Sequence, residues 1–429
     1  MSQPDNKADQ SATFCILPWI HQYIGPPGDV KPCCVYEQDM KLGDFKKDSL
    51  STIFNNAESK QLRLDLLNGV IAPGCAKCNI RVNLISTPRS EFNVLFLNEE
   101  THKLVNSTRE DGSLEHFRLQ YLDMRFNNLC NFRCRTCGPR FSTTWIDDIV
   151  RLFNIPKDKL IEHDAVFQFP GKTQNALFEE LRPQLPYIKQ IYFAGGEPLI
   201  TENHYQVLEE LIRLGRHNDP PLALRINYNT NLSQLKLKQY NVLDFWKQFN
   251  NVRVDASIDG SYARAEYWRK GTVWADIVNN RKAILEQCPN VEFGISSTMS
   301  WVNALNLIDL HKEWIELGLL DSRTTSFVVN QLDVPSYYSL KAVPIQKKQQ
   351  IEKALLEHID WMIEHNLETF VINKFKNAIT FMYNSDSSNK FVESKQFLER
   401  NNRLDIIRNE CFWDVFPEHN DIKKLLKEK

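Results

Sequence analysis

Three closely spaced cysteines are the residues of this chain best suited to chemistry. Cys130, Cys134 and Cys137 follow the pattern Cys-x3-Cys-x2-Cys. Neighbouring thiolates can hold an iron–sulfur cluster, whose usual protein coordination is four cysteines. With three protein ligands, one iron keeps an open position that a small molecule can occupy, and an open metal position is typical of a reactive centre. The alternatives are a zinc knuckle or three unrelated cysteines.

The neighbouring segments place these cysteines at the end of a strand. Residues 119–125 alternate between apolar and polar side chains, which predicts a strand. Gly138 and Pro139 end any regular element, and a helical pattern begins near Ser142. The three thiols are therefore expected on a loop that leaves the carboxyl end of a strand.

This loop resembles that of the radical S-adenosylmethionine (SAM) superfamily, in which Cys-x3-Cys-x-aromatic-Cys holds a [4Fe–4S] cluster. The resemblance implies that Cys130, Cys134 and Cys137 hold such a cluster and that its open iron binds SAM. One position departs from the family pattern. The residue before the third cysteine is usually aromatic and lies beside the adenine, and here it is Thr136.

Composition indicates a globular protein of two or three domains, since the chain has 429 residues. The net charge of −2 gives no reason to expect nucleic acid or an anionic membrane as a partner. No apolar stretch approaches the length of a membrane span, and residues 1–12 lack the apolar core of a signal peptide. We therefore expect a cytoplasmic protein, in which ten cysteines favour metal binding over disulfides.

A second set of cysteines lies upstream. Cys15, either Cys33 or Cys34, and the Cys75-x2-Cys78 pair make a four-thiolate set. Such a set fits a closed [4Fe–4S] cluster or a four-cysteine zinc site, and spacing alone does not choose between them. Because Cys33 and Cys34 are adjacent, their side chains should diverge. We expect Cys33 to be the ligand, with Cys34 a buried thiol or an alternative ligand.

Residues 14–82 resemble the SPASM/twitch auxiliary-cluster domain that accompanies many radical SAM enzymes. The shared features are Cys-x-x-Pro-Trp from Cys15, a Gly-x-Val-x-Pro-Cys-Cys segment, Leu42-Gly43, Arg63 and Cys-x-x-Cys. The resemblance implies an iron–sulfur cluster rather than zinc. The domain usually follows the catalytic barrel, whereas here it precedes it.

From Leu119 onward, strand patterns alternate with helical patterns. Six β/α units imply a parallel sheet, and right-handed crossovers give a full or partial barrel with its site at the carboxyl ends of the strands. The expected fold is therefore α/β, a partial (β/α)6 TIM-like barrel of the radical SAM type, with a small N-terminal cysteine-rich domain and a C-terminal helical extension. The predicted strands are 119–125, 189–194, 223–229, 252–257, 291–298 and 324–331.

These patterns predict four regions along the chain. Residues 1–12 form a disordered tail, and 13–118 form the auxiliary-cluster domain and a connection. Residues 119–335 form the barrel. Residues 336–429 are helical, with helices at about 345–366, 370–383 and 389–407.

A glycine-rich turn follows the second predicted strand. It consists of Gly195, Gly196, Glu197 and Pro198. Glycines at a strand end let the backbone approach a ligand closely. The turn looks like the family's GGEP motif, which implies contact with the amino group of SAM, and an ordinary turn is the alternative.

Polar residues also follow the third and fourth strands. Asn231 lies in a segment similar to the family's Thr-Asn-Gly, with Leu232 in place of the glycine. Ser257 and Asp259 are similar to the family's Ser-x-Asp-Gly. Ser257 can bond a ribose hydroxyl or a carboxylate, and Asp259 can cap the next helix. Arg269 can bind the SAM carboxylate through two hydrogen bonds, or lie on the surface.

The resemblance implies an enzyme that reductively cleaves SAM to a 5′-deoxyadenosyl radical and takes a hydrogen atom from a substrate. Its cofactors would be the SAM-binding [4Fe–4S] cluster, SAM and a second iron–sulfur cluster, with flavodoxin or ferredoxin as electron donor. A peptide or protein, such as a ribosomally made peptide, is the expected substrate. A small molecule is the alternative, as is an iron–sulfur or zinc electron carrier without SAM chemistry. No catalytic side chain beyond the cluster ligands is assigned, and the reaction subclass stays open between oxidoreductase, transferase and isomerase.

Overall fold

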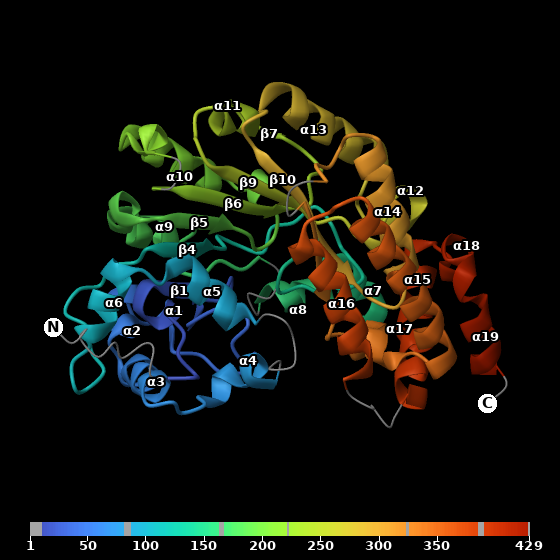
Figure 1. Ribbon diagram of the computed structural model, residues 1–429, viewed down its shortest axis with the longest axis horizontal. Helices are drawn as coiled ribbons and strands as arrows, with labels where there is room; N and C mark the ends of the chain where they lie inside the picture. Colours follow the sequence, from blue (N-terminus) through green and yellow to red (C-terminus); the bar gives the residue numbers. More distant parts are fainter. Residues whose placement is uncertain are drawn as a thin grey trace. The chain divides into compact units, whose positions relative to one another are not determined.

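The computed structural model describes residues 11–80, 87–162, 167–220, 223–322, 326–384 and 390–427 (Figure 1). All but the last two residues of the expected tail 1–12 lie outside these ranges. The chain divides into two compact units. The first comprises residues 1–127, 168–227 and 249–251, and the second comprises 128–167, 228–248 and 252–429. The predicted domain boundaries, which follow chain order, stay a prediction.

The cysteine-rich segment of the first unit combines a short hairpin with small helices, drawn in blue in Figure 1. The segment on either side of the Gly-Pro-Pro-Gly turn at residues 25–28 is an antiparallel hairpin, formed by β1 and β2. Polar side chains at Ser49, Asn56, Thr87 and Asn98 accept hydrogen bonds from the first turns of the helices that follow them, which explains where those helices begin. The elements are α1 (Leu17–Ile20), β1 (His21–Ile24), β2 (Asp29–Lys31), β3 (Gly43–Asp44), α2 (Leu50–Phe54), α3 (Ala57–Leu67), α4 (Ala76–Ile80), α5 (Pro88–Phe96) and α6 (Glu99–Asn106).

The sheet of the first unit joins this segment to the predicted barrel strands. Its order is β3-β2-β1-β4-β5, followed by the start of β6. Strand β1 pairs in parallel with β4, with His21 opposite Tyr121 and Tyr23 opposite Asp123. Strand β4 in turn pairs in parallel with β5. The further elements are β4 (Tyr121–Met124), α9 (Ala176–Leu181), β5 (Gln190–Phe193), α10 (Glu202–Arg213) and β6 (Arg225–Thr230).

The second unit carries the remaining parallel strands. The end of β6 is followed in the sheet by β9, β10 and β11, and the β9–β10 and β10–β11 pairs are parallel. All six predicted strands are present with shifted ends, although residues 324–325 of the last one lie outside the described ranges. The α/β class is therefore confirmed. The elements are α7 (Trp145–Phe153), α8 (Lys157–Glu162), β7 (Lys236–Leu237), β8 (Tyr240–Asn241), α11 (Val242–Trp246), β9 (Val252–Ala256), α12 (Tyr262–Trp268), α13 (Trp274–Gln287), β10 (Glu292–Met299), α14 (Ala304–Glu316) and β11 (Phe327–Gln331).

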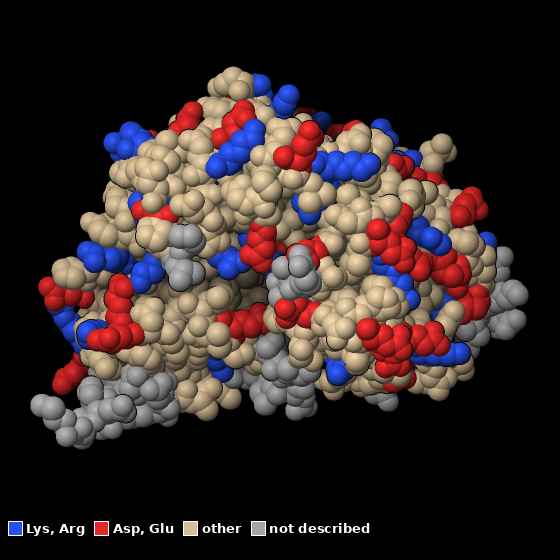
Figure 2. All heavy atoms as spheres, turned by 45° about the horizontal axis from the view of Figure 1, so that its top comes forward, with Lys and Arg blue, Asp and Glu red and all other residues tan. Residues whose placement is uncertain are grey.

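The C-terminal region of the second unit is helical, as predicted. Helix α16 packs against β11 and α15, and α17 packs against α7. None of the described helices combines the length and apolar character needed to cross a bilayer. Acidic and basic side chains are interspersed on the face shown in Figure 2, in keeping with the small net charge. The helices are α15 (Ile345–Glu364), α16 (Thr369–Tyr383), α17 (Lys390–Arg408), α18 (Phe412–Val415) and α19 (Asn420–Lys427).

Candidate iron–sulfur sites

The loop of Cys130, Cys134 and Cys137 is held by backbone hydrogen bonds to the end of α12 and the residues just after it. Within the loop, Cys137 N donates to Cys134 O at 3.0 Å. Outside it, the amides of residues 133 and 135 donate to the carbonyls of residues 270 and 268, at 2.8 and 2.9 Å. Cys130 and Cys134 are buried around Phe132, and Cys137 lies at the edge of this apolar cluster. The three thiols are thus gathered on one short, well-anchored loop.

Gly271 lets the residues after α12 approach the cysteine loop closely. Its φ of +113° lies in a region that favours glycine. A Cβ at this position would lie 2.8 Å from both the carbonyl oxygen of Asn131 and Cδ1 of Phe132. A larger residue at position 271 would therefore push the cysteine loop away from the segment that holds it.

Arg269 places a positive charge beside the thiols. Its side chain is 14% exposed, and Nη1 lies 3.9 Å from Cys134 Sγ. Nε donates to Asp259 Oδ2 at 2.7 Å, and the other oxygen of that buried carboxylate accepts from Thr298 N at 2.7 Å. Burial acts to lower the pKa of Arg269, but Asp259 and Cys134 outweigh burial and raise this pKa. Arg269 is therefore a fixed cation beside the loop.

Asp259 differs from the expectation that it caps the next helix. The N-cap position of α12 is occupied by Ser261. Both carboxylate oxygens of Asp259 are instead used by Arg269 and the Thr298 amide. The residue orients a cation rather than a helix end.

Asn231 also reaches the cysteine loop. Its Nδ2 lies 4.0 Å from Cys130 Sγ and donates to Asn131 Oδ1 at 2.8 Å. The next residue, Leu232, has a φ of +56° and is fully buried. It adopts the left-handed conformation for which glycine is the usual residue, at some cost in strain. Ser257 lies on the neighbouring strand end, where its amide donates to Thr230 O at 2.7 Å.

The glycine-rich turn of the first unit packs against the end of β4. Gly195 has a φ of +114°, and a Cβ there would lie 3.2 Å from Cβ of Arg125. Gly196 N donates to the carbonyl oxygen of Asn127, which lies three residues before the first loop cysteine in the chain. Glu197 is buried, and its carboxylate accepts from Leu199 N at 3.1 Å. The turn containing Pro198 is thus tied to the strand that leads into the cysteine loop.

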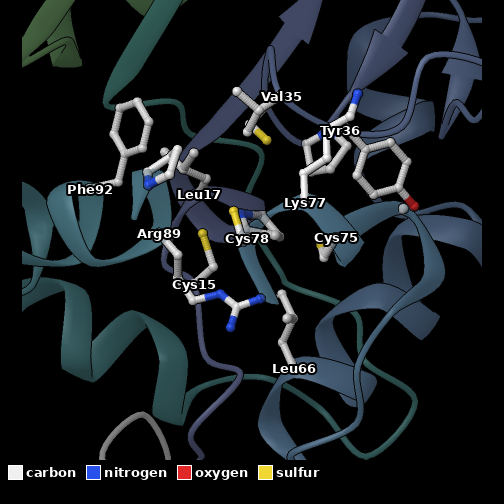
Figure 3. Close-up of a pocket in the computed structure, with 15 residues that line it drawn as sticks. Cys15, Leu17, Val35, Tyr36, Leu66, Cys75, Lys77, Cys78, Arg89 and Phe92 are labelled. Carbon is white, nitrogen blue, oxygen red and sulfur yellow. The ribbon is translucent and has the colours of Figure 1, made fainter. Parts of the chain in front are cut away.

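Four upstream cysteines surround one cavity of about 30 Å³. Figure 3 shows Cys15, Cys75 and Cys78 around the same space, and Cys33 also lines it. Cys34 is not a lining residue and is exposed. Most of the other lining residues are apolar. These are Leu17, Pro18, Pro32, Val35, Leu66, Pro88 and Phe92.

The chemistry of this donor set fits a four-cysteine cluster. Burial raises the pKa of Cys15 to about 12 and that of Cys75 to about 11, while Arg89 lowers both values. Ligation replaces the protons of such thiols by metal. Within the described ranges, no three His, Cys, Asp or Glu side chains form a group suited to one metal ion. Arg89 supplies a positive charge that would offset the negative charge of a thiolate-bound cluster.

Arg89 was missed by the sequence analysis, because nothing in its spacing relates it to the cysteines. It lies at the start of α5, beyond the Cys-x-x-Cys pair, and the fold brings it to the cavity. In Figure 3 its side chain lies next to Cys15. A basic residue in the helix after a Cys-x-x-Cys pair is the signal that could have indicated it.

Two further residues shape the cysteine-rich segment. A Cβ on Gly74 would lie 2.0 Å from the ring of Tyr36, so glycine is required beside Cys75. Arg63, noted above only through a resemblance, is buried and donates to the carbonyl of Pro18 at 3.0 Å. It thereby holds the chain just after Cys15.

Comparisons with known proteins give matches over parts of this chain. Residues 15–79 match the SPASM family model, an iron–sulfur cluster-binding domain. Two curated relatives are both named GTP 3′,8-cyclase. The protein of Staphylococcus haemolyticus (strain JCSC1435) is 31% identical over 127 residues, covering 30% of this chain and 31% of the relative. That of Sulfurimonas denitrificans (strain ATCC 33889 / DSM 1251) is 27% identical over 137 residues, covering 32% and 35%. The chain thus spans about a third of the length of these relatives.

Solved structures give a weaker likeness. "Native anSMEcpe with bound AdoMet and Cp18Cys peptide" is 17% identical, with a TM-score of 0.36 over 56% of this chain and 58% of that one. A histidine-tagged anSMEcpe with bound AdoMet has the same identity and a TM-score of 0.41, over 58% and 61%. The SPASM match confirms the predicted cluster-binding domain. The similarity to the cyclases, over about a third of each chain, agrees with the predicted relationship to radical SAM enzymes.

Proposed function

We propose that this chain is an enzyme that cleaves SAM reductively and uses the resulting 5′-deoxyadenosyl radical to take a hydrogen atom from a substrate. Cys130, Cys134 and Cys137 would hold the [4Fe–4S] cluster that supplies the electron for this cleavage. The observation that supports the proposal most directly is the approach of Asn231 and Arg269 to the cysteine loop. Of these, the Arg269 cation is suited to bind the carboxylate of SAM.

The side chains of the second unit would bind and orient SAM. Asp259 occupies Nε of Arg269 and keeps its guanidinium next to Cys134. From there the guanidinium can bind a carboxylate by charge-assisted hydrogen bonds. Asn231 is held by the side chain of Asn131, and Ser257 offers a hydroxyl on the adjacent strand end. Ser257 is proposed to bind the ribose or the carboxylate.

In the first unit, the turn made of Gly195, Gly196, Glu197 and Pro198 is the proposed contact of the SAM amino group. Its support is the motif and its attachment to the end of β4. The buried Glu197 carboxylate supplies negative charge, although one of its oxygens also accepts from a backbone amide.

The upstream site is proposed to hold the second iron–sulfur cluster on Cys15, Cys33, Cys75 and Cys78. Four thiols around one largely apolar cavity support this set, and the exposed position of Cys34 outside the lining supports Cys33 as the ligand. The cluster would pass electrons to or from the substrate radical. A flavodoxin or ferredoxin is the proposed external donor, and the cytoplasm is the proposed compartment.

A peptide or protein is the first proposed substrate, because enzymes that carry a SPASM-type domain most often act on peptides. A small molecule is the second candidate. The similarity to proteins named GTP 3′,8-cyclase favours it, over about a third of each chain. Incubation with SAM, reductant and either GTP or a panel of peptides, followed by mass spectrometry, distinguishes the two.

The proposed SAM cleavage is tested by anaerobic reconstitution with iron and sulfide, addition of dithionite and SAM, and chromatography for 5′-deoxyadenosine. We expect product from the wild-type protein and none from Cys134→Ser. Cys288→Ala is the matched control, because Cys288 is a buried cysteine of the same unit that lies far along the chain from the loop. A fully loaded wild-type protein that forms no 5′-deoxyadenosine refutes the proposal.

The upstream cluster is tested by metal counting. A variant with Cys130, Cys134 and Cys137 all changed to alanine should keep about four irons per chain. Adding Cys33→Ser to that variant should remove this iron, whereas adding Cys34→Ser should not. Zinc in place of iron, or loss of iron in the Cys34→Ser variant alone, contradicts the assignment.

A further inference from the structure

Arg135 links the cysteine loop to the C-terminal helices. It lies between the second and third loop cysteines, and its side chain is completely buried. Nη1 donates to Asn401 Oδ1 at 2.9 Å, and Nη2 donates to Asp405 Oδ1 at 2.5 Å and to Glu410 Oε2 at 2.7 Å. These partners lie on α17 and just beyond it, 266 to 275 residues away in the chain.

The carboxylate of Asp405 is itself held in place. Its Oδ1 also accepts from the hydroxyl of Tyr267 at 2.7 Å, and Oδ2 accepts from Phe412 N at 2.8 Å. The ring of Tyr267 lies 3.8 Å from the guanidinium carbon of Arg135. Asn401 Nδ2 donates to the same hydroxyl at 3.0 Å. The network therefore has a single well-defined geometry, as a buried cation requires.

A second anchor lies one turn further along α17. Arg408 donates to Asp148 Oδ2 on α7 through Nε at 3.0 Å and Nη2 at 2.7 Å, and both side chains are fully buried. Nη2 also donates to the carbonyl of Arg133 at 2.8 Å. Trp145 Nε1 donates to the carbonyl of Cys134 at 3.0 Å. Helices α17 and α7 also pack against each other, and side chains of both donate to carbonyls of the loop.

Charge is nearly balanced within this network. Lys270 pairs with the second oxygen of Glu410 at 2.8 Å, and Arg133 pairs with Asp148 at 3.3 Å. Four cations thus face three carboxylates, Asp148, Asp405 and Glu410. The network adds little net charge next to the cysteines, so its effect on them is geometric.

We propose that the segment 401–412 is a positioning element for the SAM-binding cluster. Through Arg135 and Arg408 it holds the loop between the second and third cysteines in the conformation that accepts the cluster. It also closes that side of the loop to water and oxygen. The inference rests on the proposed function in one respect, namely that Cys130, Cys134 and Cys137 bind a cluster.

The test compares Asp405→Asn and Tyr267→Phe with wild type after anaerobic reconstitution. The measured quantity is the rate at which a ferrous chelator removes iron from the SAM-binding cluster, in proteins whose upstream cluster serves as internal standard. We expect the loop cluster to be lost at least tenfold faster in Asp405→Asn and several-fold faster in Tyr267→Phe, with the upstream cluster unchanged. Tyr267→Phe removes one hydroxyl and keeps the ring, so it tests the idea even if Asp405→Asn folds poorly.

Asp421→Asn is the matched control, because Asp421 pairs with the buried Lys347 in the same C-terminal region without contacting the loop. It should lower thermal stability without changing the loop cluster. Arg135→Lys should restore part of the cluster lifetime lost in Arg135→Met. If Asp405→Asn, Tyr267→Phe and Asp421→Asn all lose iron at the wild-type rate, the inference is wrong. A stable loop cluster that forms no 5′-deoxyadenosine refutes the proposed function alone and leaves the positioning role standing.

Discussion

Replacing Arg63 by methionine should destabilise the cysteine-rich segment by about 4 kcal/mol. The side chain is buried and forms four hydrogen bonds. Nε donates to Pro18 O at 3.0 Å and Nη2 to Phe54 O at 2.7 Å. Nη1 donates to Asn55 Oδ1 and Gly112 O, both at 3.2 Å. A net contribution of about 1 kcal/mol for each bond gives the total, because methionine leaves four oxygen acceptors without their donor.

The Arg63 side chain stays positively charged although it is buried. Burial lowers its pKa to about 10, so the guanidinium is still protonated at neutral pH. Its carbon also lies 4.3 Å from the centre of the Phe54 ring, a contact that methionine keeps only as packing. Anaerobic thermal unfolding, followed by circular dichroism, should show a melting temperature lowered by roughly 10 °C. The upstream site should bind less iron, because Arg63 holds the chain just after Cys15.

Arg109→Met is the control for Arg63→Met. Arg109 is an exposed arginine of the same unit, and its contact with Glu115 is 3.5 Å long. Surface pairs of this kind contribute about 0–1 kcal/mol, so the control should unfold near the wild-type temperature. The reasoning is refuted if the two variants unfold at the same temperature and bind the same amount of iron.

Three further predictions follow from single residues. Gly195→Ala should lose about 1–3 kcal/mol, because a Cβ at φ +114° is strained and approaches Arg125; an unchanged urea midpoint contradicts this. Burial lowers the pKa of His204 to about 3, so the unfolded chain binds a proton there below pH 6.5 while the folded chain does not. The free energy of unfolding should therefore fall by about 2 kcal/mol between pH 7 and pH 5, and His204→Phe should abolish this fall. If wild type and His204→Phe lose the same unfolding free energy over this pH range, the prediction is wrong. Asp259→Asn should release Arg269 and weaken SAM binding to the reconstituted protein about tenfold, or about 1.4 kcal/mol, and an unchanged Kd from calorimetry disproves the positioning role.

Local patterns were sufficient to locate the barrel strands. The 252–257 and 291–298 segments carry the β-branched and apolar residues of buried strands, and each lies within one residue of the observed β9 and β10. Strand β1 is different, because all four of its residues are buried and no alternation marks it as half-exposed. Its parallel partner lies about a hundred residues away, a distance over which periodicity carries no information.

The candidate sites were also predictable only in part, because local spacing indicates the cysteines but not the distant residues that contact them. Cysteine spacing predicted two sets of thiols, and the fold gathers each set in one place. Adjacency implied different surroundings for Cys33 and Cys34, and Cys33 lines the cavity whereas Cys34 does not. Side-chain partners were harder to predict. Asp259 stands where a helix cap is expected, but its carboxylate instead binds Arg269, ten residues later in the chain. The partners of Arg135 lie 266 to 275 residues away in the chain, so only the folded chain reveals them.

The pairing of β1 with β4 also constrains how the protein is made. During synthesis His21 emerges about a hundred residues before Tyr121, the residue opposite it. Until then one edge of β1 has no strand to pair with, and such an edge is open to wrong partners. Contacts that close so long a loop also form slowly. The cysteine-rich segment is therefore expected to complete its folding only after β4 has left the ribosome, so the proposed upstream cluster would be loaded no earlier than that point of synthesis.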